Sequence, residues 1–290
     1  MDHQEQFRRA ALALDVPEDE VSRFIGHLRW AIRLDGLADP DGIPVGRFGG
    51  PPRLPVGTSW PDNGQGDLPF VFSVDCAALP RVDGFDLPLD GSLLFFLDHQ
   101  YDHEECHAEH RGYARVMHIP AGVETAVAEP PHHELVADEQ YDVDAAVVAW
   151  LPDCLEMDEG EMLPFHERLA HELRSSMPHL DELEALADEL WPPSDGLSSG
   201  FLGGYADDEV LETLAEQILR EREKSDGTTI PREEWFDRMA DEQRRLMNEW
   251  MSLASFLPFA EFYYGRMSIR RDDLAAGRLD RMLSMTHFTE

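Results

Sequence analysis

Apolar and polar positions divide the chain into short apolar runs, bounded by glycine and proline, and longer stretches with helical spacing. Residues 68–75 and 92–98 are rich in Phe, Val and Leu, which predicts strands that are buried on at least one face. The same pattern predicts strands over residues 113–120, 144–151, 250–256 and 265–269. The chain therefore contains many short strands.

Helical spacing marks the rest of the chain. Residues 4–34 indicate two helices, with Val21, Phe24 and Ile32 among the apolar positions that would face the core. Residues 156–190 have leucines spaced by three or four, and Pro178 divides them into two segments. Residues 207–224 and 232–249 predict two long polar helices with a turn between them.

The second half of the chain repeats the order of the first. A turn at Gly203-Gly204 corresponds to Gly49-Gly50, the strand at 250–256 to the strand at 68–75, and the strand at 265–269 to that at 91–97. The offsets differ, which indicates a diverged duplication with insertions. We expect an α+β fold with a mostly antiparallel sheet in two pseudo-repeated halves, N-terminal helices and helical insertions. The expected bounds are a helical segment at 1–40 and one domain at 41–290, with pseudo-repeats at about 45–155 and 200–290 and insertions at about 156–190 and 207–249.

Several short motifs are similar to those of one family. They are Phe48-Gly49-Gly50, Trp60-Pro61, Leu68-Pro69-Phe70, Leu79-Pro80, Gly91-Ser92-Leu93-Leu94, Leu202-Gly203-Gly204-Tyr205, residues 250–256, and Gly265 through Arg270-Arg271-Asp272-Asp273-Leu274. On these residues the chain resembles the YwqG-like family of bacterial proteins, a domain of unknown function. The resemblance implies a fold and no activity. The chain has Ala206 where the family has proline, and it lacks the family's acidic stretch before the last strand, so a function that depends on those acids is not implied here.

Charge is the extreme feature of the composition. The chain has 59 acidic and 24 basic residues, for a net charge of −35. This balance argues against binding to nucleic acid or to anionic membranes, and it would attract a basic protein. The alternative is an acidic surface that only aids solubility. No run approaches the ~20 apolar residues of a membrane helix, no secretory signal is visible, and Cys76, Cys106 and Cys154 are widely spaced, so we expect a cytoplasmic protein with reduced thiols.

Two motifs match catalytic patterns without the required context. His103 and His107 satisfy the zinc-binding pattern H-E-x-x-H, with His99 and His110 nearby, but no apolar stripe flanks them as a zinc-binding helix would need. We interpret residues 99–110 as an exposed polar loop and these four histidines as weak metal candidates. Residues 196–200 match G-x-S-x-G, but a turn rather than a strand precedes them. We assign no catalytic residue and no cofactor.

Two classes of function remain from the sequence. The first is a non-catalytic interaction module that binds a basic protein, such as a toxin that it neutralises. The alternative is a small-molecule binder or enzyme with a site between the pseudo-repeats, or a metal-binding protein that uses residues 99–110. The candidate binding residues lie beside the glycine turns and the last strand: Arg47, Gly49, Gly50, Trp60, Gly203, Gly204, Tyr205 and Arg270. The sequence leaves the oligomeric state open.

Overall fold

The computed structural model describes residues 3–36, 42–64, 66–104, 112–137, 139–155, 164–192, 199–257 and 263–288. Its helices are α1 (His3–Ala13), α2 (Glu18–His27), α3 (His99–Glu104), α4 (Pro164–Ser176), α5 (Leu180–Leu190), α6 (Asp208–Asp226), α7 (Arg232–Glu249) and α8 (Arg271–Ala275). Its strands are β1 (Arg29–Gly36), β2 (Gly46–Phe48), β3 (Arg53–Pro55), β4 (Phe70–Asp75), β5 (Ser92–Leu97), β6 (Ala114–Ile119), β7 (Thr125–Val127), β8 (Tyr141–Trp150), β9 (Gly200–Gly203), β10 (Trp250–Phe256), β11 (Tyr263–Arg270) and β12 (Leu283–Phe288).

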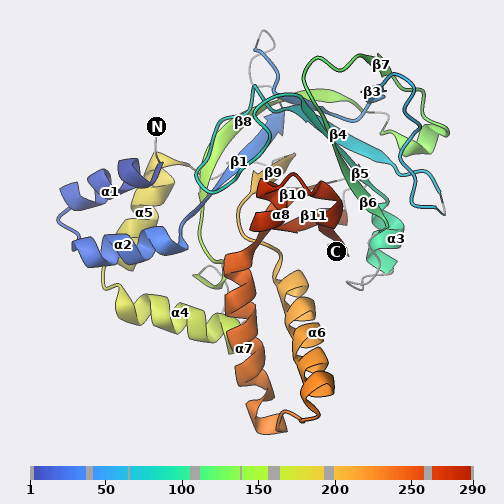
Figure 1. Ribbon diagram of the computed structural model, residues 1–290. Helices are drawn as coiled ribbons and strands as arrows, with labels where there is room; N and C mark the ends of the chain where they lie inside the picture. The colour runs from blue at the N-terminus through green and yellow to red at the C-terminus, as the bar shows by residue number, and fades with distance from the viewer. Residues whose placement is uncertain are drawn as a thin grey trace.

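Ten of the described strands form one antiparallel sheet in the order β12-β11-β10-β9-β1-β8-β2-β4-β5-β6. The sheet curves strongly, so that its two ends approach each other (Figure 1). On the inner face, the ring of Phe256 on β10 lies edge-on to Phe72 on β4, with the ring centres 5.1 Å apart. Helix α3 follows β5 and packs against β12. The sheet is therefore close to a closed barrel, and the predicted α+β fold is confirmed.

The sheet has two corresponding halves. Strands β2, β4, β5 and β6 form one antiparallel meander beside β8, and β9, β10, β11 and β12 form the other beside β1. Each meander has a register shift at the same place, between Phe70 and Phe72 in the first and between Ser252 and Ala254 in the second. A shared bulge position is a feature that duplicated halves would keep.

The bulges also correct the alignment of the halves that the sequence indicated. Phe256 pairs with Gly265, and Val74, the residue equivalent to Phe256, pairs with Leu93. Gly265 therefore corresponds to Leu93 rather than to Gly91. A glycine at the start of each strand suggests the wrong correspondence, because the bulge and not the glycine fixes the pairing of the strands.

Residues 4–34 are helical only as far as α2, so the prediction of helix up to residue 34 is wrong. Strand β1 begins at Arg29 and lies between β8 and β9, in the middle of the sheet. Trp30, Ala31, Ile32 and Leu34 are all buried. A strand that is covered on both faces has no polar alternation, and a short apolar run of this kind can be mistaken for a helix. The bounds given to the domains and insertions stay predictions.

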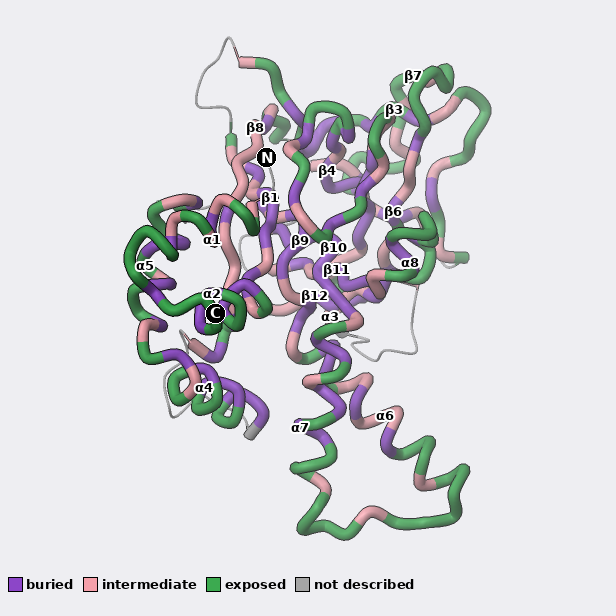
Figure 2. The backbone as a smooth tube through the Cα atoms, turned by 60° about the vertical axis from the view of Figure 1, so that its left-hand side comes forward, coloured by how far each residue is buried: buried purple, intermediate pink, exposed green. Residues whose placement is uncertain are grey.

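Most of the helices lie in two groups, and α4 contacts the second group through α7. Helices α1, α2 and α5 pack together at one side of the sheet, where Phe7 stacks on Phe24 with their ring centres 5.1 Å apart. Helices α6 and α7 form an antiparallel hairpin that extends away from the sheet (Figure 1), and its far end is exposed (Figure 2). No described helix is long and apolar enough to cross a membrane.

Candidate functional site

The side chains of β11 alternate between the two faces of the sheet, and the candidate site lies on one of these faces. Gly265, Met267 and Ile269 are buried on the inner side, and Tyr264, Arg266 and Ser268 point the other way. Strand β10 places Ser252 opposite Ser268 and Ser255 opposite Arg266. Residues directly opposite each other on antiparallel strands project from the same face of the sheet. The outer face of β10 and β11 is therefore polar, and its three serines are buried.

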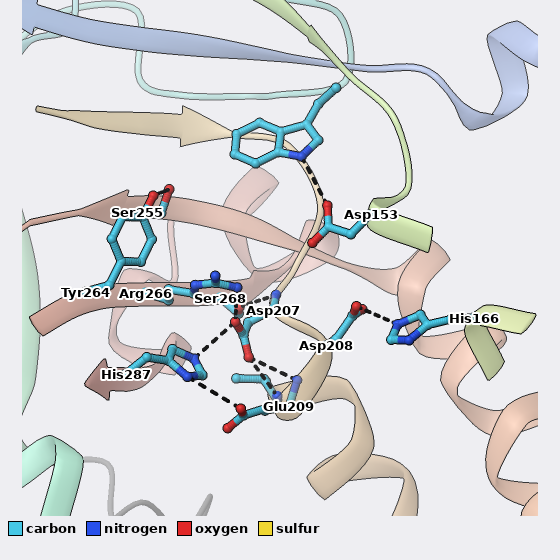
Figure 3. A network of polar contacts seen from close by, with 12 residues as sticks. Asp153, His166, Asp207, Asp208, Glu209, Ser255, Tyr264, Arg266, Ser268 and His287 are labelled. Carbon is cyan, nitrogen blue, oxygen red and sulfur yellow. Dashed lines mark hydrogen bonds and ion pairs between the residues drawn. The ribbon is translucent and has the colours of Figure 1, made fainter. Parts of the chain in front are cut away.

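Asp207 covers this face and lies at the centre of the polar network (Figure 3). Its carboxylate caps helix α6, because Oδ1 accepts hydrogen bonds from the backbone N–H of Glu209 at 3.0 Å and of Val210 at 3.2 Å. Oδ2 pairs with Arg266 and lies 3.2 Å from Nε2 of His287. The backbone N–H of Asp207 donates to the Ser268 hydroxyl at 3.4 Å. One residue thus fixes the start of α6 against β11 and β12.

The charge of Asp207 is stabilised although the side chain is only 2% exposed. Burial by itself would raise the pKa of Asp207, but His287, Arg266 and the backbone N–H of Val210 together lower it to about 2. At neutral pH the carboxylate is ionised and its acceptor positions are occupied. Asp207 is therefore a structural anion rather than a proton donor.

A small pocket of about 60 Å³ lies between this face and the end of β8. Its lining residues come from β10 and β11, from the segment before α6 and from the segment after β8: Trp150, Asp153, Tyr205, Ala206, Asp207, Ser252, Ser255, Tyr264, Arg266 and Ser268. At the pocket, the Trp150 indole donates to Asp153 over 3.5 Å (Figure 3). The volume suits a group of a few heavy atoms.

Neighbouring groups give little sign of an activated nucleophile. Burial raises the pKa of the Cys154 thiol to about 12, and that of Cys76 to about 11. His166 lies 2.7 Å from Asp208 through Nε2, and this hydrogen bond raises the pKa of His166. Thiols with raised pKa values are poor nucleophiles. Neither of these buried thiols is therefore an activated nucleophile.

Comparison with known proteins places the chain in a family. Residues 46–257 match the model of a domain of unknown function, DUF1963. The chain belongs to the DUF1963 family. No curated protein matches the chain at a significant level.

The DUF1963 match covers β2 to β10 and ends before β11. The pocket therefore includes Ser252 and Ser255 from the matched region, and Tyr264, Arg266 and Ser268 from beyond it. The family is described as a domain of unknown function, so membership in DUF1963 assigns no activity.

The two glycine turns of this DUF1963 chain have structural reasons for glycine. Gly49, Gly50, Gly203 and Gly204 all have positive φ values, between 63° and 89°. A Cβ atom on Gly49 would lie 2.1 Å from the carbonyl oxygen of Glu139, and one on Gly204 would lie 2.8 Å from the Trp150 ring. The turns pair with opposite ends of the β1–β8 ribbon, since Phe48 is opposite Tyr141 and Gly203 is opposite Ala31. The structure therefore does not bring them together.

The predicted site residues fall at three different places. Tyr205 lines the pocket, and Arg270 lies two residues beyond Ser268 on β11, 3.3 Å from Glu249. Arg47 instead lines a groove of about 430 Å³ over β2, β4 and β5, where its Nε donates to Asp142 at 2.8 Å. Trp60 donates to the Leu68 carbonyl at 2.8 Å and packs against Phe96. Their roles in binding stay predictions.

Tyr205 contributes to the pocket mainly by its fixed position. Its hydroxyl donates to the backbone carbonyl of His27, and the guanidinium of Arg29 lies over its ring at 5.2 Å. Burial raises the pKa of Tyr205 to about 12. The phenol is thus protonated at neutral pH and already engaged, so it shapes the pocket wall.

The histidine segment is not a loop at its start. His99 and His103 lie on helix α3, and Asp102 between them is buried against β12. His103 Nδ1 lies 3.0 Å from the Thr286 carbonyl, and the His99 ring lies edge-on to Tyr263. His107 and His110 lie outside the described residues, and so does Ser198 of the G-x-S-x-G motif. Among the residues that are described, no three His, Cys, Asp or Glu side chains gather as metal ligands.

Sequence reasoning missed the serines and Arg266. Isolated serines in an apolar strand have no distinctive spacing, and Asp207 is one of many acids. The available signal was the alternation of Tyr264, Arg266 and Ser268 with apolar residues, which marks a polar strand face. That this face is covered depends on the position of α6, which is not visible in the strand itself.

Proposed function

We propose that this DUF1963 protein is a non-catalytic module that binds a basic protein. The observation that supports it best is the outward face of α5. Asp181, Glu182, Asp188 and Glu189 are exposed there, and the helix has no basic residue. Within the described part of the chain, none of these four carboxylates is paired with an arginine or histidine. Complementary charge speeds and orients the association of two proteins.

The arginines of the chain are largely used within it, which leaves the carboxylates of α5 available. Glu242, buried between α6 and α7, pairs with Arg222 and Arg245. Asp273 in the same way pairs with both Arg278 and Arg281. These arginines are paired with buried carboxylates, so they do not neutralise the exposed carboxylates of α5.

Within this proposal, the protein is cytoplasmic and YwqG-like, and the partner is a toxin that it neutralises. The short motifs around the glycine turns support the YwqG-like assignment, and the net charge of −35 supports a basic partner. A protein that neutralises a toxin by binding it through an acidic surface needs no catalytic group. A role of this kind fits the high pKa values of the Cys76 and Cys154 thiols.

The test is isolation of the untagged protein from its native cell, with two charge variants. The first variant carries Asp181→Asn, Glu182→Gln, Asp188→Asn and Glu189→Gln. The control carries Glu212→Gln, Glu221→Gln, Glu233→Gln and Asp241→Asn, which are exposed positions on α6 and α7. Both variants change the net charge equally, so only the place of the change differs.

We expect a stoichiometric basic protein with the wild type and the control, and its loss with the α5 variant. Co-expression of that partner with the wild-type protein should also protect the cell from it. Isolation without a basic partner would contradict the proposal, and so would equal loss in both variants, which would indicate non-specific attraction.

A further inference from the structure

Equivalent positions in the two halves of the sheet carry opposite chemistry. The pairs around the bulge in the first half are Phe70 with Phe96 and Ser73 with Leu94. The corresponding pairs in the second half are Ser252 with Ser268 and Ser255 with Arg266. Ser252, Ser268 and Arg266 therefore stand where the first half has Phe70, Phe96 and Leu94.

In the first half the positions equivalent to Ser252, Ser268 and Arg266 are apolar and closely packed, and a groove of about 430 Å³ lies beside them. Phe70, Leu94 and Phe96 are at most 2% exposed and form a small core with Leu54, Leu68 and Ile119. Trp60 packs against it. The second half has the pocket of about 60 Å³ at the same place. Since apolar residues can fill this position, the fold itself does not require the polar ones.

The pocket lining offers donors from Ser252 and Arg266, and the carboxylate of Asp153 adds acceptor oxygens. The Ser268 hydroxyl already accepts from the Asp207 backbone, and the Ser255 hydroxyl accepts from Tyr264. Ser252 is 7% exposed, and its hydroxyl has no partner among the described residues. Arg266 Nε is buried without a partner in the same part of the chain. A buried donor without an acceptor destabilises the folded protein, so an acceptor supplied by a ligand would be favourable.

The charge around the pocket selects against an anion. The cation of Arg266 is neutralised by Asp207, and Asp153 adds a second carboxylate to the lining. The chain as a whole has a net charge of −35. An acceptor oxygen on a neutral group satisfies the donors without placing a negative charge beside two carboxylates.

We propose that this pocket binds a small neutral carboxamide group. Its oxygen accepts a hydrogen bond from the Ser252 hydroxyl, beside the side chain of Arg266, and its nitrogen donates toward Asp153. The amide and the carboxylate complement each other as donor and acceptor, and the pocket volume suits a group of acetamide size. This site is separate from the α5 face, so its failure would leave the proposed binding of a basic protein unaffected.

The test is a titration followed by the indole N–H signal of Trp150 in nitrogen-15 NMR spectra. The probes are acetamide, acetate and methylammonium, which are similar in size and differ in charge. We expect acetamide to shift the signal saturably, with a dissociation constant in the millimolar range that suits so few atoms. Acetate and methylammonium should leave it unchanged.

Two variants and a control locate the effect. Ser252→Ala should weaken acetamide binding about 10-fold, the usual effect of one lost hydrogen bond. Ser252→Phe introduces the residue of the first half and should abolish binding while the protein stays folded by circular dichroism. Ser73→Ala, at the position equivalent to Ser255, is the matched control and should change nothing. A shift with acetate or methylammonium instead of acetamide would overturn the proposal, as would no shift with any probe, which would mean that the pocket holds only water.

Discussion

At the scale of single residues, Asp207 connects helix α6 with strands β11 and β12. It caps α6, pairs with Arg266 on β11 and lies beside His287 on β12. Nothing in its sequence neighbourhood distinguishes it from Asp208, which follows it. Its role comes from the position of the chain after the Gly203-Gly204 turn, which brings the start of α6 onto the covered face of β11.

Asp207→Asn should lower the free energy of unfolding by about 2 kcal/mol at pH 7. Asparagine can still cap the helix, but Arg266 and His287 lose their counter-charge. The folded pKa of Asp207, about 2, lies below its ordinary value of 3.8. Its ionisation therefore stabilises the protein above pH 4, and this contribution is lost as the pH falls from about 4 to about 2. Urea unfolding at several pH values checks this: the wild type and the variant should converge in that window, and a constant difference would contradict the role.

Alanine substitutions at two glycines distinguish the cost of a clash with the new Cβ atom from the cost of a positive φ. Gly49 and Gly57 have φ values of 63° and 85°, but only Gly49 has an atom close to the place of a Cβ, the Glu139 oxygen at 2.1 Å. We expect Gly57→Ala to cost about 1 kcal/mol and Gly49→Ala more than about 3 kcal/mol in urea unfolding. Equal costs would mean that the β2 turn adjusts easily.

At the scale of elements, α3 closes the sheet by docking onto β12. Asp102 is 4% exposed and accepts hydrogen bonds from the hydroxyls of Ser284 and, at 2.8 Å, Thr286. Burial raises the pKa of Asp102 even though both hydroxyls lower it. Asp102 therefore makes two hydrogen bonds to β12, but ionisation of its carboxyl group destabilises the folded protein.

Asp102→Asn should therefore stabilise the protein at pH 7, by about 1 kcal/mol. A folded pKa above the ordinary value means that ionisation penalises the folded state, and the penalty grows as the pH rises from about 4 through the folded pKa. The gain should vanish at pH 3, where both forms are neutral. Asp102→Ala is the contrast, since it leaves two hydroxyls without an acceptor and should destabilise by about 1–3 kcal/mol. Thermal unfolding at pH 3 and pH 7 measures both, and an Asn variant that is weaker at pH 7 would contradict the assignment.

The sequence predicted elements where its local pattern was strong. Glycine and proline bound β4 and β5, and Pro178 separates α4 from α5 as expected. Strand β1 was missed because its apolar residues, such as Ile32, are buried by neighbours from distant parts of the chain. The pocket could not be predicted, because it forms where the start of α6 covers the strand face that carries Ser252. That Ser252 corresponds to Phe70 is visible only from the pairing of the strands around the bulges.

At the scale of the whole molecule, duplication and charge are the two dominant features. The duplication gives two meanders that pack their inner faces together, as Phe72 and Phe256 do. The inner faces of both halves are apolar, whereas Ser252, Ser268 and Arg266 make the outer face of the second half polar. The charge is distributed unevenly, since arginines such as Arg245 are paired within the helical hairpin and the α5 face has none.

The central proposal, binding of a basic protein, is tested most directly by native mass spectrometry of the untagged protein taken from its own cells at low salt. We predict one species with the mass of this chain plus a basic protein, which dissociates as the ionic strength rises, because exposed charge pairs are screened. The chain alone under all conditions would contradict the proposal. The chain with one bound zinc ion and no protein partner would contradict it as well, and would instead direct attention to the histidines of residues 99–110.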